Sequence, residues 1–208
     1  MSHFLPLFPL NLVVFPNERL NLHIFEPRYK ELVNDCWTSD SHFGIPSYVT
    51  SKIEFGTEME ITEIFKTYED GRMDIKTLGH KVFKVKEYLN PWPDKKYSAG
   101  QVTDLESVMD YTSAKLELFD LLDQLYGKLD IDQEVEYHTE TAVFQLAHKV
   151  GLTKTQEYQL LQITHESKRV DFLINHLKKL LPKLSKAAEI RNRIKMNGHF
   201  RQMDSLDF

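Results

Sequence analysis

The chain has 208 residues, 41% hydrophobic and 27% charged, with a formal net charge of −5; this excludes a largely disordered protein and suffices for one large or two small domains. The single cysteine, Cys36, excludes an intramolecular disulfide, a thiolate metal cluster and a C-x-x-C redox pair. No apolar run approaches about 18 residues and the first four residues contain no basic signal-peptide region, so we expect a soluble, cytoplasmic protein without a membrane span.

The first 29 residues contain three short apolar runs separated by prolines. Residues 5–10 and 20–24 alternate at the two-residue period of a strand. Because Pro6 and Pro9 cannot donate to a strand ladder, we expect the first strand to lie at a sheet edge or a bulge. Pro27 suits the first position of a helix, where a missing N–H costs nothing, and predicts a helix over residues 27–35.

The same residues carry a family resemblance. The sequence reads L-P-L-F-P-L at 5–10, V-V-F-P at 13–16 and L-x-L-x-I-F-E-P-R-Y at 20–29, and it resembles the opening of the Lon protease N-terminal domain. The resemblance covers about residues 4–184 and implies a PUA-like pseudo-barrel that binds substrates without catalysis. The sequence contains no Walker-type phosphate loop and, at 208 residues, has no room for a separate peptidase domain. We therefore expect a stand-alone substrate-binding domain with a role in protein quality control.

Further short strands are predicted in the first half of the chain. Pro46 places its strand at an edge or a bulge, and a slip in the alternation between Ile61 and Ile64 predicts a bulge. Asp70 and Gly71 form a hairpin turn signal. A series of short antiparallel strands with turns between them is typical of a small barrel or sandwich. The predicted strands cover residues 42–49, 58–68, 73–78, 81–88 and 97–105.

From residue 112 the apolar period becomes helical. Gly127 and Asp130 are expected to end the first of these helices, and the capping box of Thr153 and Gln156 opens the third. Pro182 should kink or break the fourth helix, since it removes one backbone hydrogen bond, and a basic helix resumes beyond it. The predicted helices cover residues 112–130, 143–150, 153–163, 170–184 and 185–196.

These elements predict an α+β fold, in which an N-terminal β-rich PUA-like pseudo-barrel is followed by a C-terminal helical bundle. We expect a β-rich domain over residues 1–108, a helical subdomain over 109–197 and a C-terminal tail over 198–208.

The sequence offers no catalytic site. Residues 165–166 begin like the zinc motif H-E-x-x-H, but Arg169 stands where the second histidine is needed. Asp35, next to Cys36, disfavours a reactive thiolate, so a buried helix cysteine is expected. There is no G-x-S-x-G motif, and the eight glycines are scattered. We expect a non-enzymatic protein with no metal site and no cofactor.

Four of the five candidate binding residues belong to the motif that carries the resemblance, and the fifth is Trp92. Glu26 and Arg28 have an alternative structural role at the helix N-terminus, and Tyr29 an alternative role in the core. Trp92, between two prolines in a hairpin tip, is either a rigid exposed contact for a partner or a plug that closes the barrel end. The candidate peptide-binding residues are Phe25, Glu26, Arg28, Tyr29 and Trp92.

The favoured function is a module that binds exposed apolar or extended segments of polypeptides and unfolded protein clients. Residues 5–10 or 42–49 could pair with a peptide strand at a sheet edge, while aromatic residues cover its side chains. A third possibility is recognition of a small molecule in a barrel cleft, which a pocket lined by several aromatic residues would favour.

RNA binding is the alternative function. Residues 166–201 contain ten Lys or Arg and three Asp or Glu, a local charge of +7, which leaves −12 on the rest of the chain. Such a basic segment is either a surface that binds nucleic acid or a solvated helix face that docks on the acidic remainder of the same chain. The candidate nucleic-acid residues are Lys183, Lys186, Arg191, Arg193 and Lys195.

Overall fold

A computed structural model describes residues 2–131 and 142–203, and the described side chains end at Ile190. The chain divides into two compact units that are interleaved in sequence: Met1–Tyr111 with Ala142–Arg169, and Thr112–Thr141 with Val170–Phe208. The two units are defined by contacts within the chain and are not the domains expected from the sequence. The expected domain boundaries at 108 and 197 stay a prediction. The fold is the expected mixture of a β-rich first part and helices.

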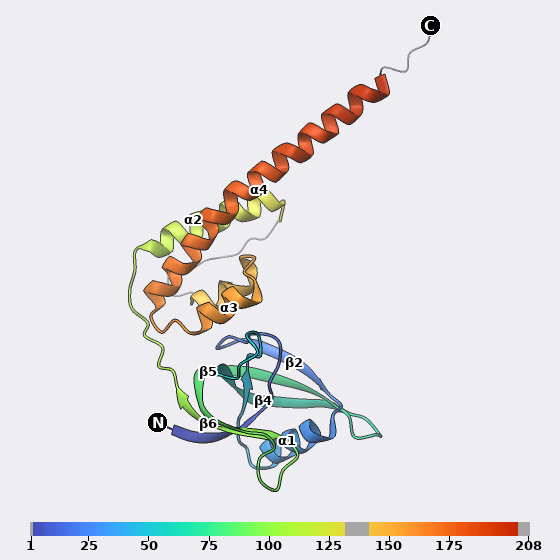
Figure 1. Cartoon of the computed structure of the whole chain (residues 1–208), viewed down its shortest axis with the longest axis vertical. Coiled ribbons are helices and arrows are strands. Elements are labelled where there is room, and N and C mark those ends of the chain that lie inside the picture. The colour runs from blue at the N-terminus through green and yellow to red at the C-terminus, as the bar shows by residue number, and fades with distance from the viewer. Residues whose placement is uncertain (1, 132–141, 204–208) are drawn as a thin grey trace. The chain divides into compact units, whose positions relative to one another are not determined.

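The first unit is built on a six-stranded sheet with the order β2-β5-β4-β3-β1-β6 (Figure 1). β6 also pairs with β5, so five of the strands close into a barrel and β2 is added to one half of β5. The bounds are β1 Ser2–Leu7, β2 Arg19–Ile24, β3 Phe43–Pro46, β4 Phe55–Thr67, β5 Met73–Leu89 and β6 Ser98–Asp104.

The long β4–β5 hairpin forms the main wall of the barrel (Figure 1). The register shifts between Ile61 and Glu63, where a bulge was predicted. Gly71 in the connecting turn has φ 76°, a conformation that glycine adopts without strain. β5 is one continuous strand where two were predicted, because its first half pairs with β2 and its second half with β6.

The prediction that prolines place the first strand and the 42–49 strand at a sheet edge or a bulge is wrong, since the described pairings of both strands also show no register shift. β1 lies between β6 and β3, and β3 lies between β1 and β4. Pro6 is tolerated because the pairing with β3 begins only at Leu7, so Pro6 has a paired strand on one side. Pro46 ends β3 and contributes its carbonyl, which accepts from the Leu10 amide at 3.2 Å.

Helix α1, Pro27–Thr38, begins at the predicted proline and extends three residues beyond the predicted end. Tyr29, Leu32, Val33 and Cys36 form its buried face. This face packs into the main apolar core together with side chains of the barrel, including Phe8, Phe43, Met59, Ile75 and Tyr97. The start of α1 is thereby fixed relative to the barrel.

The first unit also contains two short helices from the second half of the chain. The 3₁₀ helix η1, Val143–Lys149, and α3, Lys154–Leu161, follow each other. The predicted capping box is present, with the Thr153 side chain accepting from the Gln156 amide and the Gln156 side chain accepting from the Thr153 amide. The ring of Phe144 stacks on Phe15 at 5.1 Å, which attaches η1 to the first unit's core.

The second unit contains α2, Ala114–Leu129, and α4, Glu166–Met203, from Val170 onward. Gly127 lies inside α2, and Asp130 alone ends the helix in a left-handed conformation with φ 52°. Pro182 was expected to kink or break the fourth helix; it does not break it, since α4 is assigned as one helix through this residue, and a kink stays a prediction. The loss of one hydrogen bond is small against the many others of a 38-residue helix. None of the described helices combines the length and apolar character needed to span a bilayer.

Candidate functional site

A cavity of about 350 Å³ lies on the first unit beside the start of α1. Four separate segments meet there: the stretch after β1, the N-terminus of α1, the β3–β4 connection and the β5–β6 hairpin. A volume of this size is typical of pockets that hold a side chain or small ligand. The lining residues are Pro9, Asn11, Arg28, Tyr29, Tyr48, Ile53, Tyr88, Asn90 and Ser98.

Two candidate residues of the N-terminal motif, Arg28 and Tyr29, line this cavity. Arg28 donates to the Glu26 carboxylate through Nε at 2.8 Å and through Nη2 at 2.8 Å. The guanidinium also lies 4.5 Å from the centre of the Tyr29 ring. Arg28 is thus held by a two-point ion pair and a cation–π contact, yet its side chain is still 47% exposed. It can therefore contact a ligand without reorganising.

Tyr29 lines the cavity and is also part of the core. Its ring stacks on Phe8 at 3.8 Å and it is only 7% exposed. Burial raises the pKa of its hydroxyl, with Arg28 acting in the opposite direction. The accessible aromatic surface of the cavity comes instead from Tyr48, which is 47% exposed, and from the partly buried Tyr88. Sequence analysis missed both, because neither lies in the N-terminal motif.

The other two candidate peptide-binding residues lie elsewhere. Phe25 follows β2, is 59% exposed and stacks on His23 at 6.1 Å. Trp92 is partly buried against the main core and contacts Tyr97 edge to face at 6.0 Å. Neither residue lines the cavity formed around Arg28 and Tyr29. The structure therefore brings Glu26, Arg28 and Tyr29 together, whereas Trp92 packs against the core and does not line the cavity.

The basic candidates lie along α4 in the second unit. Lys183 and Lys186 are exposed. The side chains of Arg191, Arg193 and Lys195 lie outside the described residues. The proposed nucleic-acid role of all five stays a prediction.

Cys36 is 1% exposed on α1, as expected. Its thiol donates a weak hydrogen bond to the carbonyl of His42 at 3.7 Å. Burial raises the pKa of the thiol to about 11. A buried, protonated thiol is a poor nucleophile, so the structure gives Cys36 a packing role.

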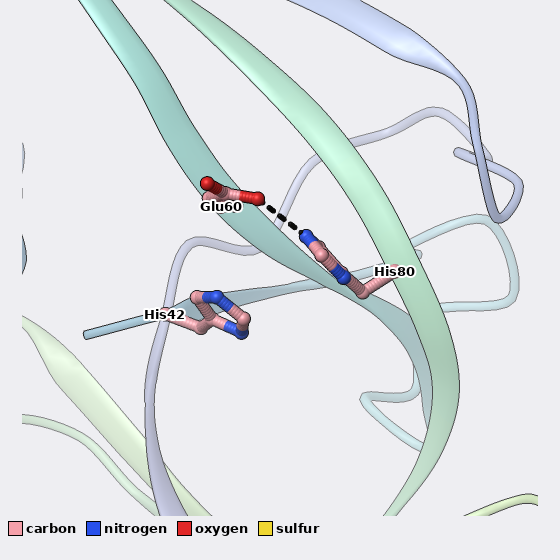
Figure 2. Close-up of side chains that lie close together, drawn as sticks. All are labelled: His42, Glu60 and His80. Atoms are coloured by element: carbon pink, nitrogen blue, oxygen red, sulfur yellow. Dashed lines mark hydrogen bonds and ion pairs between the residues drawn. The ribbon is translucent and has the colours of Figure 1, made fainter. Parts of the chain in front are cut away.

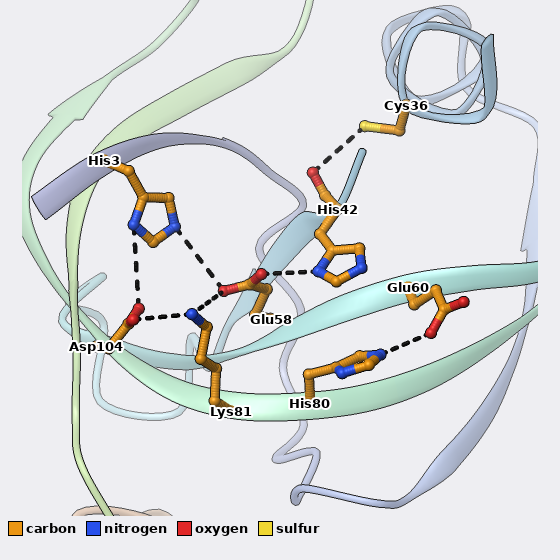
Figure 3. A network of polar contacts seen from close by, with 8 residues as sticks. All are labelled: His3, Cys36, His42, Glu58, Glu60, His80, Lys81 and Asp104. Carbon is orange, nitrogen blue, oxygen red and sulfur yellow. Dashed lines mark hydrogen bonds and ion pairs between the residues drawn. The ribbon is translucent and has the colours of Figure 1, made fainter. Parts of the chain in front are cut away.

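A set of histidines and carboxylates that sequence analysis did not connect lies on β3, β4, β5 and their neighbours. His42, Glu60 and His80 form one cluster (Figure 2), in which His80 Nε2 lies 2.7 Å from Glu60. His3, Glu58 and Asp104 form a second cluster beside it (Figure 3). The two are joined because His42 Nδ1 lies 2.7 Å from the buried carboxylate of Glu58. These residues are far apart in sequence, and only the strand order reveals their proximity.

The segment at 165–169, which resembles a zinc motif but lacks its second histidine, contains a buried ion pair. Glu166 and Arg169 are 1% and 2% exposed and lie 3.2 Å apart. Glu166 accepts from the Val143 amide at 2.8 Å, while Arg169 donates to the Ile163 carbonyl and to Ser107. The pair ties the beginning of η1 to the beginning of α4 and has no catalytic geometry of its own.

A second cavity, of about 520 Å³, opens above this ion pair. Phe144, Met109 and Arg169 contribute to its lining. Pro16 of the N-terminal motif also lines it, but none of the candidate peptide-binding residues does.

The barrel, helix α1 packed into its core and the cavity beside the start of α1 make up the fold and the candidate site of the first unit. The profile of the ATP-dependent protease La (LON) substrate-binding domain matches residues 4–179. The chain therefore belongs to the LON substrate-binding domain family, as its N-terminal motif indicated.

Solved structures agree with this assignment. The Lon N-terminal domain protein from Xanthomonas campestris is 27% identical, with a TM-score of 0.66 over 83% of this chain and 98% of that one. The N-terminal domain of Mycobacterium avium complex Lon protease is 15% identical and has the same fold, with a TM-score of 0.64 over 85% of this chain and 98% of that one. Among curated proteins, no relative matches. The predicted PUA-like, Lon-type fold is confirmed.

Proposed function

We propose that this chain is a non-catalytic module that binds exposed apolar or extended segments of other polypeptides through the cavity at Arg28 and Tyr29. The support is the family, whose described role is substrate binding, and the position of the family motif at the wall of this cavity. The observation that carries the proposal is that motif residues and accessible tyrosines from distant segments converge on one pocket.

The chemistry of the lining suits a peptide. Tyr48, Tyr88 and Ile53 offer an apolar and aromatic wall for a side chain, whereas Asn90 and Arg28 offer polar groups for the peptide backbone. Tyrosine and arginine are enriched at interface hot spots, because they provide a large contact area and directed hydrogen bonds. Arg28 is already ordered by Glu26, which reduces the entropy lost when a ligand is bound.

Strand addition at residues 5–10 or 42–49, considered from sequence, does not explain binding in this fold. β1 and β3 both lie inside the sheet. Within the described residues, β2 is the strand with a single partner, and it pairs with β5 only. We therefore propose that recognition acts mainly through side chains in the cavity.

A binding titration tests the proposal. A labelled, unstructured peptide rich in Leu and Phe is titrated with the full chain, and its fluorescence anisotropy is measured. Tyr88→Ala and Arg28→Ala should each weaken binding by about tenfold, the effect of losing about 1.4 kcal/mol at a hot spot. Phe65→Ala is the matched control, because Phe65 is 46% exposed on β4 and does not line the cavity. Equal affinity of all three variants and the unmodified chain would contradict the proposal.

The RNA alternative is tested in the same assay with a labelled RNA oligonucleotide. Electrostatic binding through α4 should weaken steeply as salt is raised and should be lost in a Lys183→Ala/Lys186→Ala double variant. Peptide binding through the cavity should resist salt and tolerate this double variant. If the chain binds RNA but not the peptide, the RNA alternative replaces the proposal. A small-molecule function predicts that a free aromatic amino acid competes with the peptide.

A further inference from the structure

We infer that His42, Glu60 and His80 form a binding site for a divalent transition-metal ion of the zinc class. Figure 2 shows Glu60 and His80 pointing toward each other from neighbouring strands, with the His42 side chain beside them. Each offers a ligand atom, and the three atoms lie within 4.8 Å of one another. Two imidazoles and one carboxylate are a common protein ligand set for Zn²⁺, and they leave a further coordination position for water.

The strand register explains why these residues converge. β4 lies between β3 and β5, and Phe43 is paired with Met59, which sets His42 beside Glu60. On the other side Glu60 is paired with Leu78, two residues before His80, so the side chains of Glu60 and His80 emerge on the same face. Glu60 is thus flanked by His80 on β5 and by His42 directly before β3.

The local geometry is close to that of a coordination sphere. Bonds of about 2.0–2.1 Å in a tetrahedral arrangement place ligand atoms about 3.3 Å apart. His80 Nε2 and Glu60 Oε2 lie 2.7 Å apart, and the rings of His42 and His80 are stacked at 4.7 Å. The three side chains are 35–43% exposed, so none of them is locked by packing on every side, and metal binding would require them to rotate.

Glu58 supports one of the ligands. Its side chain is only 9% exposed, and its Oε1 lies 2.7 Å from His42 Nδ1. A carboxylate at Nδ1 keeps the proton there, which fixes the ring orientation and leaves Nε2 to bind a metal. Figure 3 shows Glu58 between the two clusters, next to His42. A cavity of about 200 Å³ lined by His42 and Glu60 gives an ion and its water access to the site.

The neighbouring cluster of His3, Glu58 and Asp104 is less suitable for a metal ion, because a lysine ammonium already forms ion pairs with its carboxylates. The Lys81 ammonium lies 2.8 Å from Asp104 and 3.7 Å from Glu58 (Figure 3). A metal ion would have to displace this ammonium, whereas the ion-pair partner of Glu60 in the described part of the chain is His80.

Calorimetric titration of the untagged full chain with ZnCl₂ tests the inference. We expect one saturable site, and loss of that site in His42→Ala, His80→Ala and the nearly isosteric Glu60→Gln. Co²⁺ should show visible bands typical of tetrahedral nitrogen and oxygen ligation with the unmodified chain and not with the variants. His23→Ala is the matched control, because His23 pairs with Asp74 on the same sheet at 2.5 Å without a third ligand.

Three results would overturn the inference. The first is the absence of saturable Zn²⁺ binding by the unmodified chain. The second is unchanged binding in both Glu60→Gln and His80→Ala. The third is binding that survives His80→Ala but is lost in His3→Ala, which would assign the ion to the neighbouring cluster. Circular dichroism of each variant verifies that loss of binding is not loss of folding.

Discussion

His148 Nε2 lies 3.1 Å from the carboxylate of Glu18, a residue 130 positions earlier in the chain. The other ring nitrogen lies 2.8 Å from Glu157, so the imidazole is held between two carboxylates. These bonds tie η1 and α3 to the turn before β2 within the first unit. They raise the pKa of His148 to about 9, with the Glu18 hydrogen bond as the largest cause and burial acting in the opposite direction.

The His148 contact predicts a pH-dependent stability. The pKa of an unfolded histidine is about 6.5, and the folded value is higher, so this contribution is fully present below pH about 6.5 and is lost as pH rises through about 9. The ring is 41% exposed, so water screening limits the effect to about 1 kcal/mol, or about 2–4 °C in Tm. His148→Gln should remove this slope, and Glu18→Gln should reduce it, because the contact with Glu157 remains. Thermal melts that stay parallel to the unmodified chain from pH 6 to about 9.5 would show that the contact contributes nothing.

The buried Glu166–Arg169 pair predicts a large loss of stability. Arg169→Leu should lower the free energy of unfolding by about 3–5 kcal/mol, because it leaves a buried carboxylate without its guanidinium. Urea denaturation measures this loss. Adding Glu166→Gln to Arg169→Leu should restore part of it, since the uncompensated charge is gone. Lys168→Ala is the control, because Lys168 is exposed and adjacent. An Arg169→Leu variant as stable as Lys168→Ala would refute this interpretation.

Two glycines predict opposite effects of the same substitution. A Cβ at Gly56 on β4 would approach Pro46 Cα to 2.5 Å and also contact the Ile45 carbonyl oxygen. Gly56→Ala should therefore destabilise by about 1–3 kcal/mol. A Cβ at Gly127, inside α2, has nothing within 4 Å, so Gly127→Ala should stabilise by about 0.5–1 kcal/mol. Chemical denaturation of both variants measures the change in the free energy of unfolding. The same change in both variants would contradict the close packing described at Gly56.

Trp92 and Phe25 were both predicted to contact a peptide, but they differ in burial and should therefore differ in their effect on stability. Trp92 packs against the main core, so Trp92→Ala should lower stability by about 2 kcal/mol, less than for a fully buried tryptophan. Phe25 is 59% exposed, so Phe25→Ala should change stability by less than about 0.5 kcal/mol. Thermal denaturation compares the two. A neutral Trp92→Ala would indicate that this side chain is a free contact surface, as one of the two sequence interpretations held.

Local patterns predicted most of the fold. The alternation of β4, the turn at Gly71, the proline at the start of α1 and the capping box of α3 are all short-range signals, and each is confirmed. The two proline-based edge assignments failed for a common reason. Pro6 and Pro46 restrict only their own backbone, whereas strand order depends on which segments pair across the barrel. That information is not local.

The candidate site was predicted only in part, for a similar reason. Arg28 and Tyr29 were found because they belong to a recognisable motif, but Tyr48 and Tyr88 join them only through the closure of the barrel. The His42, Glu60 and His80 cluster depends on the register of three strands, and the spacings of 18 and 20 residues match no metal motif. Pairing register is what sequence analysis could not supply.

The most direct test of the central claim is to map peptide binding on the ¹⁵N-labelled full chain by NMR. The account predicts that an unstructured apolar peptide shifts the amide signals of residues around the cavity, including Asn11, Tyr48, Ile53 and Tyr88. Perturbations confined to α4 near Lys183 and Lys186, or found only at Trp92 and Phe25, would contradict recognition through the cavity at Arg28 and Tyr29.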